Sequence, residues 1–201
     1  MRKLTRTAAA AAWLLMAGIG PALPMAEASV AVPASPTSAS PAIPEVPTLR
    51  HIGVADGLPS SDVKGLAFDP DGYLWIATID GLARYDGVGM QVWRHIPGDD
   101  SSLPGNYMTV LHVDPRGRVW VAPESRGLSV LDSAREGFRH YRKADHPEMG
   151  SDDVWAITSH RGALWFGTYG GGLHRLDPDG TITRFMPRDG DPRSLPAATV
   201  L

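Results

Sequence analysis

The sequence predicts an all-β fold built from β-propeller blades, each a four-stranded antiparallel sheet, with a repeat of roughly 45 residues. Trp75, Trp120 and Trp165 are spaced 45 residues apart. Each lies in a short apolar run bounded by Gly, Asp or Pro, and similar runs come before and after it. The 22 glycines and 18 prolines also supply more turn-forming residues than a helical bundle accommodates.

Each unit shows the same order of strands and turns. The first strands are expected to begin at Val63, Met108 and Val154. Turns follow at 69–72 (DPDG), 114–117 (DPRG) and 160–162 (HRG), and in the first two Pro presets φ while Gly takes the left-handed position. The third strands begin at Gly81, Gly127 and Gly172, and the fourth lie within 89–96, 137–142 and 181–186. The blades therefore span about 58–96, 103–142 and 149–186.

The N-terminal part predicts export rather than folded structure. Residues 1–28 combine a basic start, an apolar run from Ala8 to Ile19 and an Ala-Glu-Ala cleavage pattern, as a secretory signal peptide does. That run is shorter than the roughly 20 residues of a transmembrane helix. Residues 29–48 are rich in Pro, Ala and Ser and predict an extended tether.

Two further segments match single strands of a blade. Residues 49–52 (LRHI) resemble 93–96 (WRHI), and 195–201 restart the connection that precedes each first strand. We therefore expect an orphan outer strand at 49–52, part of an inner strand at 195–201, and an incomplete ring of about three blades in 49–201. This arrangement suggests the front of a longer protein, and the alternative is a short chain that closes its ring by oligomerising.

Composition excludes several classes of function. There is no cysteine, which excludes disulfides, thiolate metal sites and cysteine nucleophiles. The net charge of −3 gives no basis for binding nucleic acid. The Asp-x-Asp-Gly stretches lack the Glu that ends an EF-hand loop, and the seven histidines show no metal-ligand spacing. We therefore predict no cofactor, no metal site and no catalytic residues.

The motifs also resemble a known family. The segments GLPSSDVKGLAFDPDGYLWIATIDGLARYDG (57–87) and DDSSLPGNYMTVLHVDPRGRVWVA (99–122) are similar to the two-component regulator propeller repeat. The resemblance covers 49–201 and implies the periplasmic sensor region of a hybrid histidine kinase or sensor diguanylate cyclase. The second repeat departs from the pattern at Pro123 and Glu124, so its second turn is expected to be irregular.

The expected function is a periplasmic ligand-sensing module of a transmembrane signalling protein. Its expected partners are a small molecule or saccharide, a downstream membrane-anchored output domain, and a second copy of the chain. Two alternatives remain open at this point, an exported propeller lyase or hydrolase and a passive protein-interaction scaffold.

Residues that break the repeat at one face indicate where a ligand would bind. Tyr107, Trp155 and Tyr169 stand where the first repeat has Asp62, Lys64 and Ile79. Repeat geometry places first-strand starts and second turns at the same face, and variable residues on such a face carry recognition. The predicted ligand-binding residues are Tyr107, Glu124, Arg126, Asp153, Trp155 and Tyr169.

Overall fold

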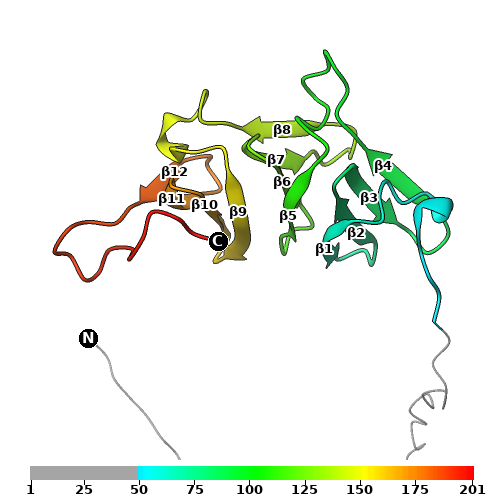
Figure 1. Ribbon diagram of the computed structural model, residues 1–201, viewed down its shortest axis with the longest axis horizontal. Helices are drawn as coiled ribbons and strands as arrows, with labels where there is room; N and C mark the ends of the chain where they lie inside the picture. The colour runs from blue at the N-terminus through cyan, green and yellow to red at the C-terminus, as the bar shows by residue number, and fades with distance from the viewer. Residues whose placement is uncertain (1–48) are drawn as a thin grey trace, which may run out of the picture. The chain divides into compact units, whose positions relative to one another are not determined.

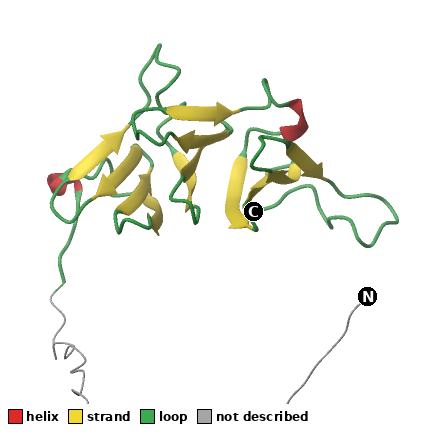
Figure 2. Cartoon of the chain, turned by 180° about the vertical axis from the view of Figure 1, so that it is seen from behind, coloured by secondary structure: helices red, strands yellow, loops and turns green. Residues whose placement is uncertain are grey.

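The computed structural model describes residues 49–201. The signal peptide and the tether predicted for 1–28 and 29–48 lie outside the described residues. Residues 49–201 form three four-stranded antiparallel sheets in which the strands follow chain order, so the predicted all-β propeller fold is confirmed. Figure 2 shows that strands make up nearly all the regular structure, apart from short helical turns at Val54–Asp56 and Pro147–Met149.

Each blade contributes four consecutive strands. They are β1 (Val63–Phe68), β2 (Leu74–Thr78), β3 (Gly81–Tyr85) and β4 (Met90–Trp93) in blade 1; β5 (Met108–Val113), β6 (Val119–Pro123), β7 (Leu128–Leu131) and β8 (Phe138–Tyr141) in blade 2; and β9 (Val154–His160), β10 (Ala163–Thr168), β11 (Gly172–Leu176) and β12 (Ile182–Phe185) in blade 3. Figure 1 shows the sheets side by side in an arc, with β1, β5 and β9 on its inner side and β4, β8 and β12 on its outer side.

Two of the three hydrophobic clusters of residues 49–201 lie between blades, and the third lies on blade 1. One cluster joins Trp75 and Leu82 of blade 1 to Met108 and Val121 of blade 2. A second joins blade 2, including Trp120, to blade 3. Trp75 and Trp120 are almost fully buried, whereas Trp165 is half-buried. A blade thus stabilises its neighbour by covering that neighbour's apolar face.

The connections between blades help to close these seams. Leu103, in the connection from β4 to β5, is fully buried between blades 1 and 2. The Ser102 hydroxyl before it accepts a hydrogen bond from Ile96 N (2.9 Å) and donates to Asp99 O (2.8 Å). The connection after β12 repeats this pattern, with Ser194 bonded to Arg188 N (2.9 Å) and to Asp191 O (2.9 Å). The shared Ser-Leu-Pro motif therefore has a structural role.

The second turn of blade 2 is irregular, as its sequence indicates. Strands β6 and β7 pair at only two positions, whereas β2 and β3 pair at five. Ser125, between β6 and β7, has a φ of 53°, an uncommon value for a residue with a side chain. The proline and glutamate that break the repeat thus coincide with a locally altered turn.

The two end segments differ from the expectation. Neither 49–52 nor 195–201 forms a regular strand, so that prediction is wrong in this structure. The reason is that no strand of the described chain pairs with 49–52, while 195–201 makes only isolated bonds to blade 3. These run from Gly172 N to Ala198 O (2.7 Å), from Val200 N to Thr168 O (3.2 Å) and from Gly170 N to Thr199 Oγ1 (3.1 Å). Within residues 49–201, no helix has the length and apolar character needed to cross a membrane.

Candidate functional site

The first-strand start and the second turn of each blade lie together at one face. In blade 2, Glu124 N donates to Tyr107 O (2.9 Å), and in blade 3, Tyr169 N donates to Asp153 O (2.9 Å). Ile79 N makes the equivalent bond in blade 1. The bonds place Tyr107 beside Glu124 and Asp153 beside Tyr169. We call this surface the strand-start face.

A further bond joins two blades at this face. Gly127 N of blade 2 donates to Asp152 O of blade 3 (2.8 Å). Because Arg126 precedes Gly127 and Asp153 follows Asp152, the bond brings a predicted residue of one blade close to one of the next. The strand-start face is therefore continuous across the seam between blades 2 and 3.

A β-bulge sets the position of Trp155. Val154 pairs with Thr168 and Ala156 pairs with Gly167, so Trp155 is the extra, unpaired residue of β9. Bulges of this kind redirect a side chain, and Trp155 remains 44% exposed. The same bulge occurs at Lys64 in β1 and at Thr109 in β5. Blade 3 is thus the blade that presents a large aromatic side chain at this position.

The other predicted side chains form an open surface rather than a single cavity. Tyr107 and Tyr169 are 42% and 62% exposed. Arg126 alone of the six lines a hollow of about 300 Å³, together with residues of the β4–β5 connection. One carboxylate oxygen of Asp153 is buried without a hydrogen-bond partner among residues 49–201.

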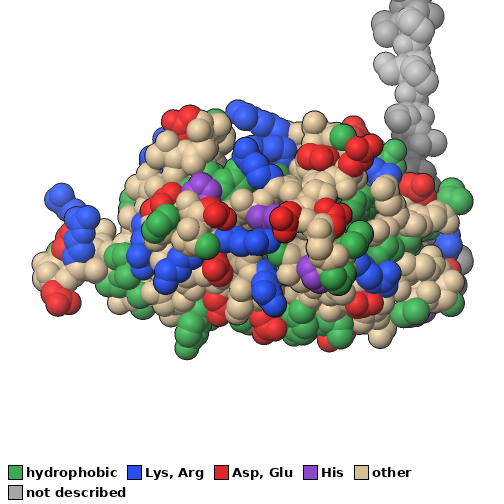
Figure 3. Space-filling model, turned by 90° about the horizontal axis from the view of Figure 1, so that it is seen from above, with side chains coloured by type: hydrophobic (Ala, Val, Ile, Leu, Met, Phe, Trp, Pro, Cys, Tyr) green, Lys and Arg blue, Asp and Glu red, His purple; other side chains and the backbone are tan. Residues whose placement is uncertain are grey.

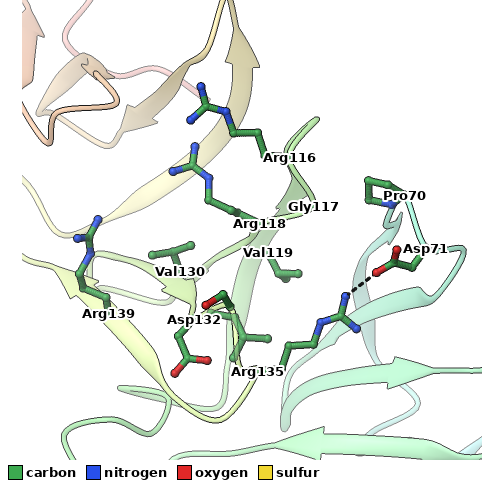
Figure 4. A pocket seen from close by; sticks show the side chains of 12 residues that line it. Pro70, Asp71, Arg116, Gly117, Arg118, Val119, Val130, Asp132, Arg135 and Arg139 are labelled. Carbon is green, nitrogen blue, oxygen red and sulfur yellow. Dashed lines mark hydrogen bonds and ion pairs between the residues drawn. The ribbon is translucent and has the colours of Figure 1, made fainter.

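The opposite face, at the first and third turns, carries a hollow of about 520 Å³ between blades 1 and 2 (Figure 4). Four arginines line it: Arg116, Arg118, Arg135 and Arg139. We call it the arginine hollow. Sequence reasoning missed it, although a signal was present: the turn after β5 has arginines at 116 and 118 where the turn after β1 has Asp71 and Tyr73.

Asp114 supports the arginine side of this hollow. Its carboxylate accepts from Arg118 Nε (2.7 Å), Arg118 N (3.0 Å) and the Trp120 indole (3.2 Å). Burial by itself would raise the pKa of Asp114, but these hydrogen bonds and the Arg118 charge outweigh burial and hold the pKa below its ordinary value. Asp114 therefore stays charged and anchors the Arg118 guanidinium at Nε.

Charged side chains elsewhere are spread over the surface of residues 49–201. Asp and Glu side chains lie among Lys and Arg over the outer side of the blades (Figure 3). In the part of the chain that the structure describes, no three His, Cys, Asp or Glu side chains approach closely enough to hold a metal ion. Burial lowers the pKa of His140, which accordingly favours its neutral form between Ser129 Oγ (2.8 Å) and Asp100 O (3.0 Å).

Comparison with known proteins identifies the repeat. Residues 57–80 match the family described as two component regulator propeller. A segment of 48 residues is 40% identical to histidine kinase P4 of Formosa agariphila, and the match covers 24% of this chain and 4% of that protein.

Two solved structures of the extracellular domain of BT4673 from B. thetaiotaomicron are 22% identical to this chain. One is described as a hybrid two component system and the other as a one component system. They align with TM-scores of 0.51 and 0.50, over 67% and 66% of this chain and 19% of theirs. The chain thus spans a small part of each protein that it matches, and the structural likeness concerns the fold. Residues 49–201 form propeller blades, and residues 57–80 within them match the two component regulator propeller repeat that the sequence motifs indicate.

Proposed function

We propose that this chain supplies the periplasmic, ligand-sensing propeller of a transmembrane signalling protein, a histidine kinase or a diguanylate cyclase. The match of residues 57–80 to the two component regulator propeller repeat carries the proposal. The relative named as a histidine kinase and the extracellular domain with the same fold support it. In this proposal the phosphotransfer or cyclase chemistry belongs to a membrane-anchored output domain, and the propeller only binds and signals.

The strand-start face is the proposed binding surface for a small molecule or saccharide. Trp155 and Tyr169 present exposed aromatic rings on which an apolar sugar face could stack. The half-buried Asp153 carboxylate would accept a hydrogen bond from a hydroxyl group. Arg126 and Glu124 would supply a further donor and acceptor at the rim. The arrangement thus combines apolar area with a few polar groups, as ligand sites do.

The seam between blades 2 and 3 provides a route for the signal. The bond from Gly127 N to Asp152 O crosses the seam beside the proposed site. A ligand that contacts both blades would favour one arrangement of the seam over another, and a change in the pairing of two copies would report that shift. A ligand shifts such an equilibrium only by its difference in affinity for the two states.

Export is tested with reporter fusions. The full chain is fused at its C-terminus to alkaline phosphatase, which is active only outside the cytoplasm, and in parallel to β-galactosidase. We expect high phosphatase and low galactosidase activity, and loss of phosphatase activity when residues 1–28 are deleted. The reverse pattern would refute the proposed location.

Binding is tested by titrating the full chain with maltose, cellobiose and lactose while following tryptophan fluorescence. We expect saturable binding of at least one sugar that weakens at least 10-fold in Trp155→Ala and Tyr169→Ala. Phe68→Ala removes an aromatic ring that is 70% exposed elsewhere on the protein and should leave affinity unchanged. Absence of binding, or equal loss in all three variants, would contradict saccharide recognition at the strand-start face.

A further inference from the structure

The arginine hollow has walls from two blades. Pro70 and Asp71 belong to the first turn of blade 1, and the remaining lining residues belong to the first and third turns of blade 2 and the strands beside them. Its volume of about 520 Å³ falls within the range of small-molecule sites, roughly 300–1,000 Å³. The hollow is therefore large enough for a compact organic ligand.

Two of the four arginines are held by carboxylates. Arg135 bonds to Asp69 and Asp71, each at 3.2 Å, and Figure 4 marks the bond to Asp71. Arg118 bonds to Asp114 through Nε, so that bond leaves its two terminal nitrogens free. Both arginines are thereby fixed in position at the hollow.

Asp132, the other acidic residue of the lining, is hydrogen-bonded within its own turn. The two carboxylate oxygens of Asp132 accept hydrogen bonds from Glu136 N and Gly137 N, each at 3.0 Å. Its charge is thus already hydrogen-bonded by backbone donors of the β7–β8 turn. Asp132 is therefore a weak competitor for the neighbouring guanidinium groups.

The other two arginines have no acidic partner. Within residues 49–201, neither Arg116 nor Arg139 forms an ion pair. Arg139 lies over the Tyr141 ring, 4.9 Å from its centroid, which orients the guanidinium without neutralising it. In Figure 4, Arg118 lies between Arg116 and Arg139. The hollow therefore carries two uncompensated positive charges around a third, anchored arginine.

Apolar side chains line the hollow beside these charges. Val119, Val130 and Leu131 are buried residues that contribute to its wall. A ligand that fits would combine an apolar ring or chain with a negative group, because guanidinium forks bind carboxylate and sulfate oxygens in pairs. A neutral molecule of the same shape would leave the arginine charges unmatched.

We propose that the arginine hollow binds a small organic anion, whose carboxylate or sulfate group is held by Arg116, Arg118 and Arg139 while its body packs against Val130 and Leu131. This site goes beyond the proposed function, because it lies on the face opposite the strand-start face and takes a ligand of different charge. It needs neither export nor saccharide binding at Trp155 to be correct.

The test compares three probes that differ only in the group at one carbon: glucose, glucuronate and glucose 6-sulfate. Calorimetric titration of the full chain should show that at least one of the two anions binds at least 10-fold more tightly than glucose. Which of the two binds distinguishes a carboxylate site from a sulfate site. Added salt should weaken the binding, because charge attraction contributes to it.

The double variant Arg116→Gln with Arg139→Gln should reduce anion affinity at least 10-fold. Arg193→Gln, which removes a charge in the loop after β12, serves as the charge-matched control and should retain affinity. Both changed arginines are exposed, and a cooperative urea transition with a midpoint close to that of the wild type would show that folding is intact, although Arg139→Gln also removes the contact with Tyr141. Equal binding of all three probes, or full anion affinity in the double variant, would overturn the proposal.

Discussion

Removal of the Asp69 carboxylate tests how the seam between blades 1 and 2 is held. The side chain is fully buried and accepts hydrogen bonds from Tyr73 N and from the Trp75 indole, both at 2.9 Å. It also accepts from Asp71 N (3.1 Å) and pairs with Arg135 of blade 2 (3.2 Å). Asp69→Ala removes all four interactions at once.

The size of the effect follows from these contacts. The Trp75 indole would become a buried donor without a partner, which costs about 1–3 kcal/mol. The two backbone donors add roughly 0.5–1 kcal/mol each, since water reaches them in part. Arg135 keeps its bond to Asp71, which is 68% exposed, so the loss of the ion pair adds little. The expected total is about 3 kcal/mol, or about 6–12 °C in melting temperature for a domain of this size.

The assay is urea unfolding of the full chain, followed by tryptophan fluorescence, with Arg135→Ala and Asp71→Asn as companions. We expect Asp69→Ala to lower the midpoint most, Arg135→Ala to lower it by an intermediate amount, and Asp71→Asn to change stability by less than about 0.5 kcal/mol. An Asp69→Ala effect below about 0.5 kcal/mol, or one no larger than that of Asp71→Asn, would refute the reasoning.

Three further predictions use comparisons within the chain. Gly81→Ala should destabilise by at least about 2 kcal/mol in urea unfolding, because a Cβ there would lie 2.6 Å from a backbone oxygen at a φ of 127°; Gly180→Ala, with a φ of 92° and open space, should cost only about 1 kcal/mol. Trp75→Phe should lower the melting temperature more than Trp165→Phe, because of these two tryptophans only Trp75 donates its indole N–H to a buried carboxylate of the described residues, that of Asp69; equal shifts would argue against this role. Asp114 has a lowered pKa, so its stabilising contribution is present above about pH 4 and lost as pH falls through the lowered value; acid unfolding of Asp114→Asn should show a smaller pH dependence than wild type below about pH 5.

The repeated features of the fold could be predicted from sequence. The spacing of Trp75, Trp120 and Trp165 placed the second strand of each blade, and the Asp-Pro turns placed the first strands of blades 1 and 2. These signals are local, because a turn depends on a few consecutive residues and a strand on the alternation within it. The sequence repeat also predicted that the start of the first strand lies beside the second turn, because this arrangement occurs in every blade.

The departures from the repeat could not be predicted in the same way. The Arg135 side chain reaches Asp69, 66 residues earlier, because blade packing brings the two turns together. The bulge at Trp155 depends on how β9 pairs with β10, and no single residue type predicts it. The arginine hollow likewise needs turns from two blades. Contacts of this kind depend on how neighbouring units meet, which a single sequence shows only through unusual residues such as Arg116 and Arg118.

The third turn of blade 2 shows how one irregular segment can serve both stability and binding. The segment from Asp132 to Gly137 is six residues long, whereas β3 and β4 are joined by four residues and β11 and β12 by five. Its Arg135 carbonyl accepts a hydrogen bond from the Trp93 indole of blade 1 (3.2 Å), while the Arg135 side chain reaches Asp69. The same segment lines the arginine hollow. Because one turn joins the seam and forms part of the hollow, an anion bound there would contact the element that couples blades 1 and 2, and anion binding should raise the stability of that seam.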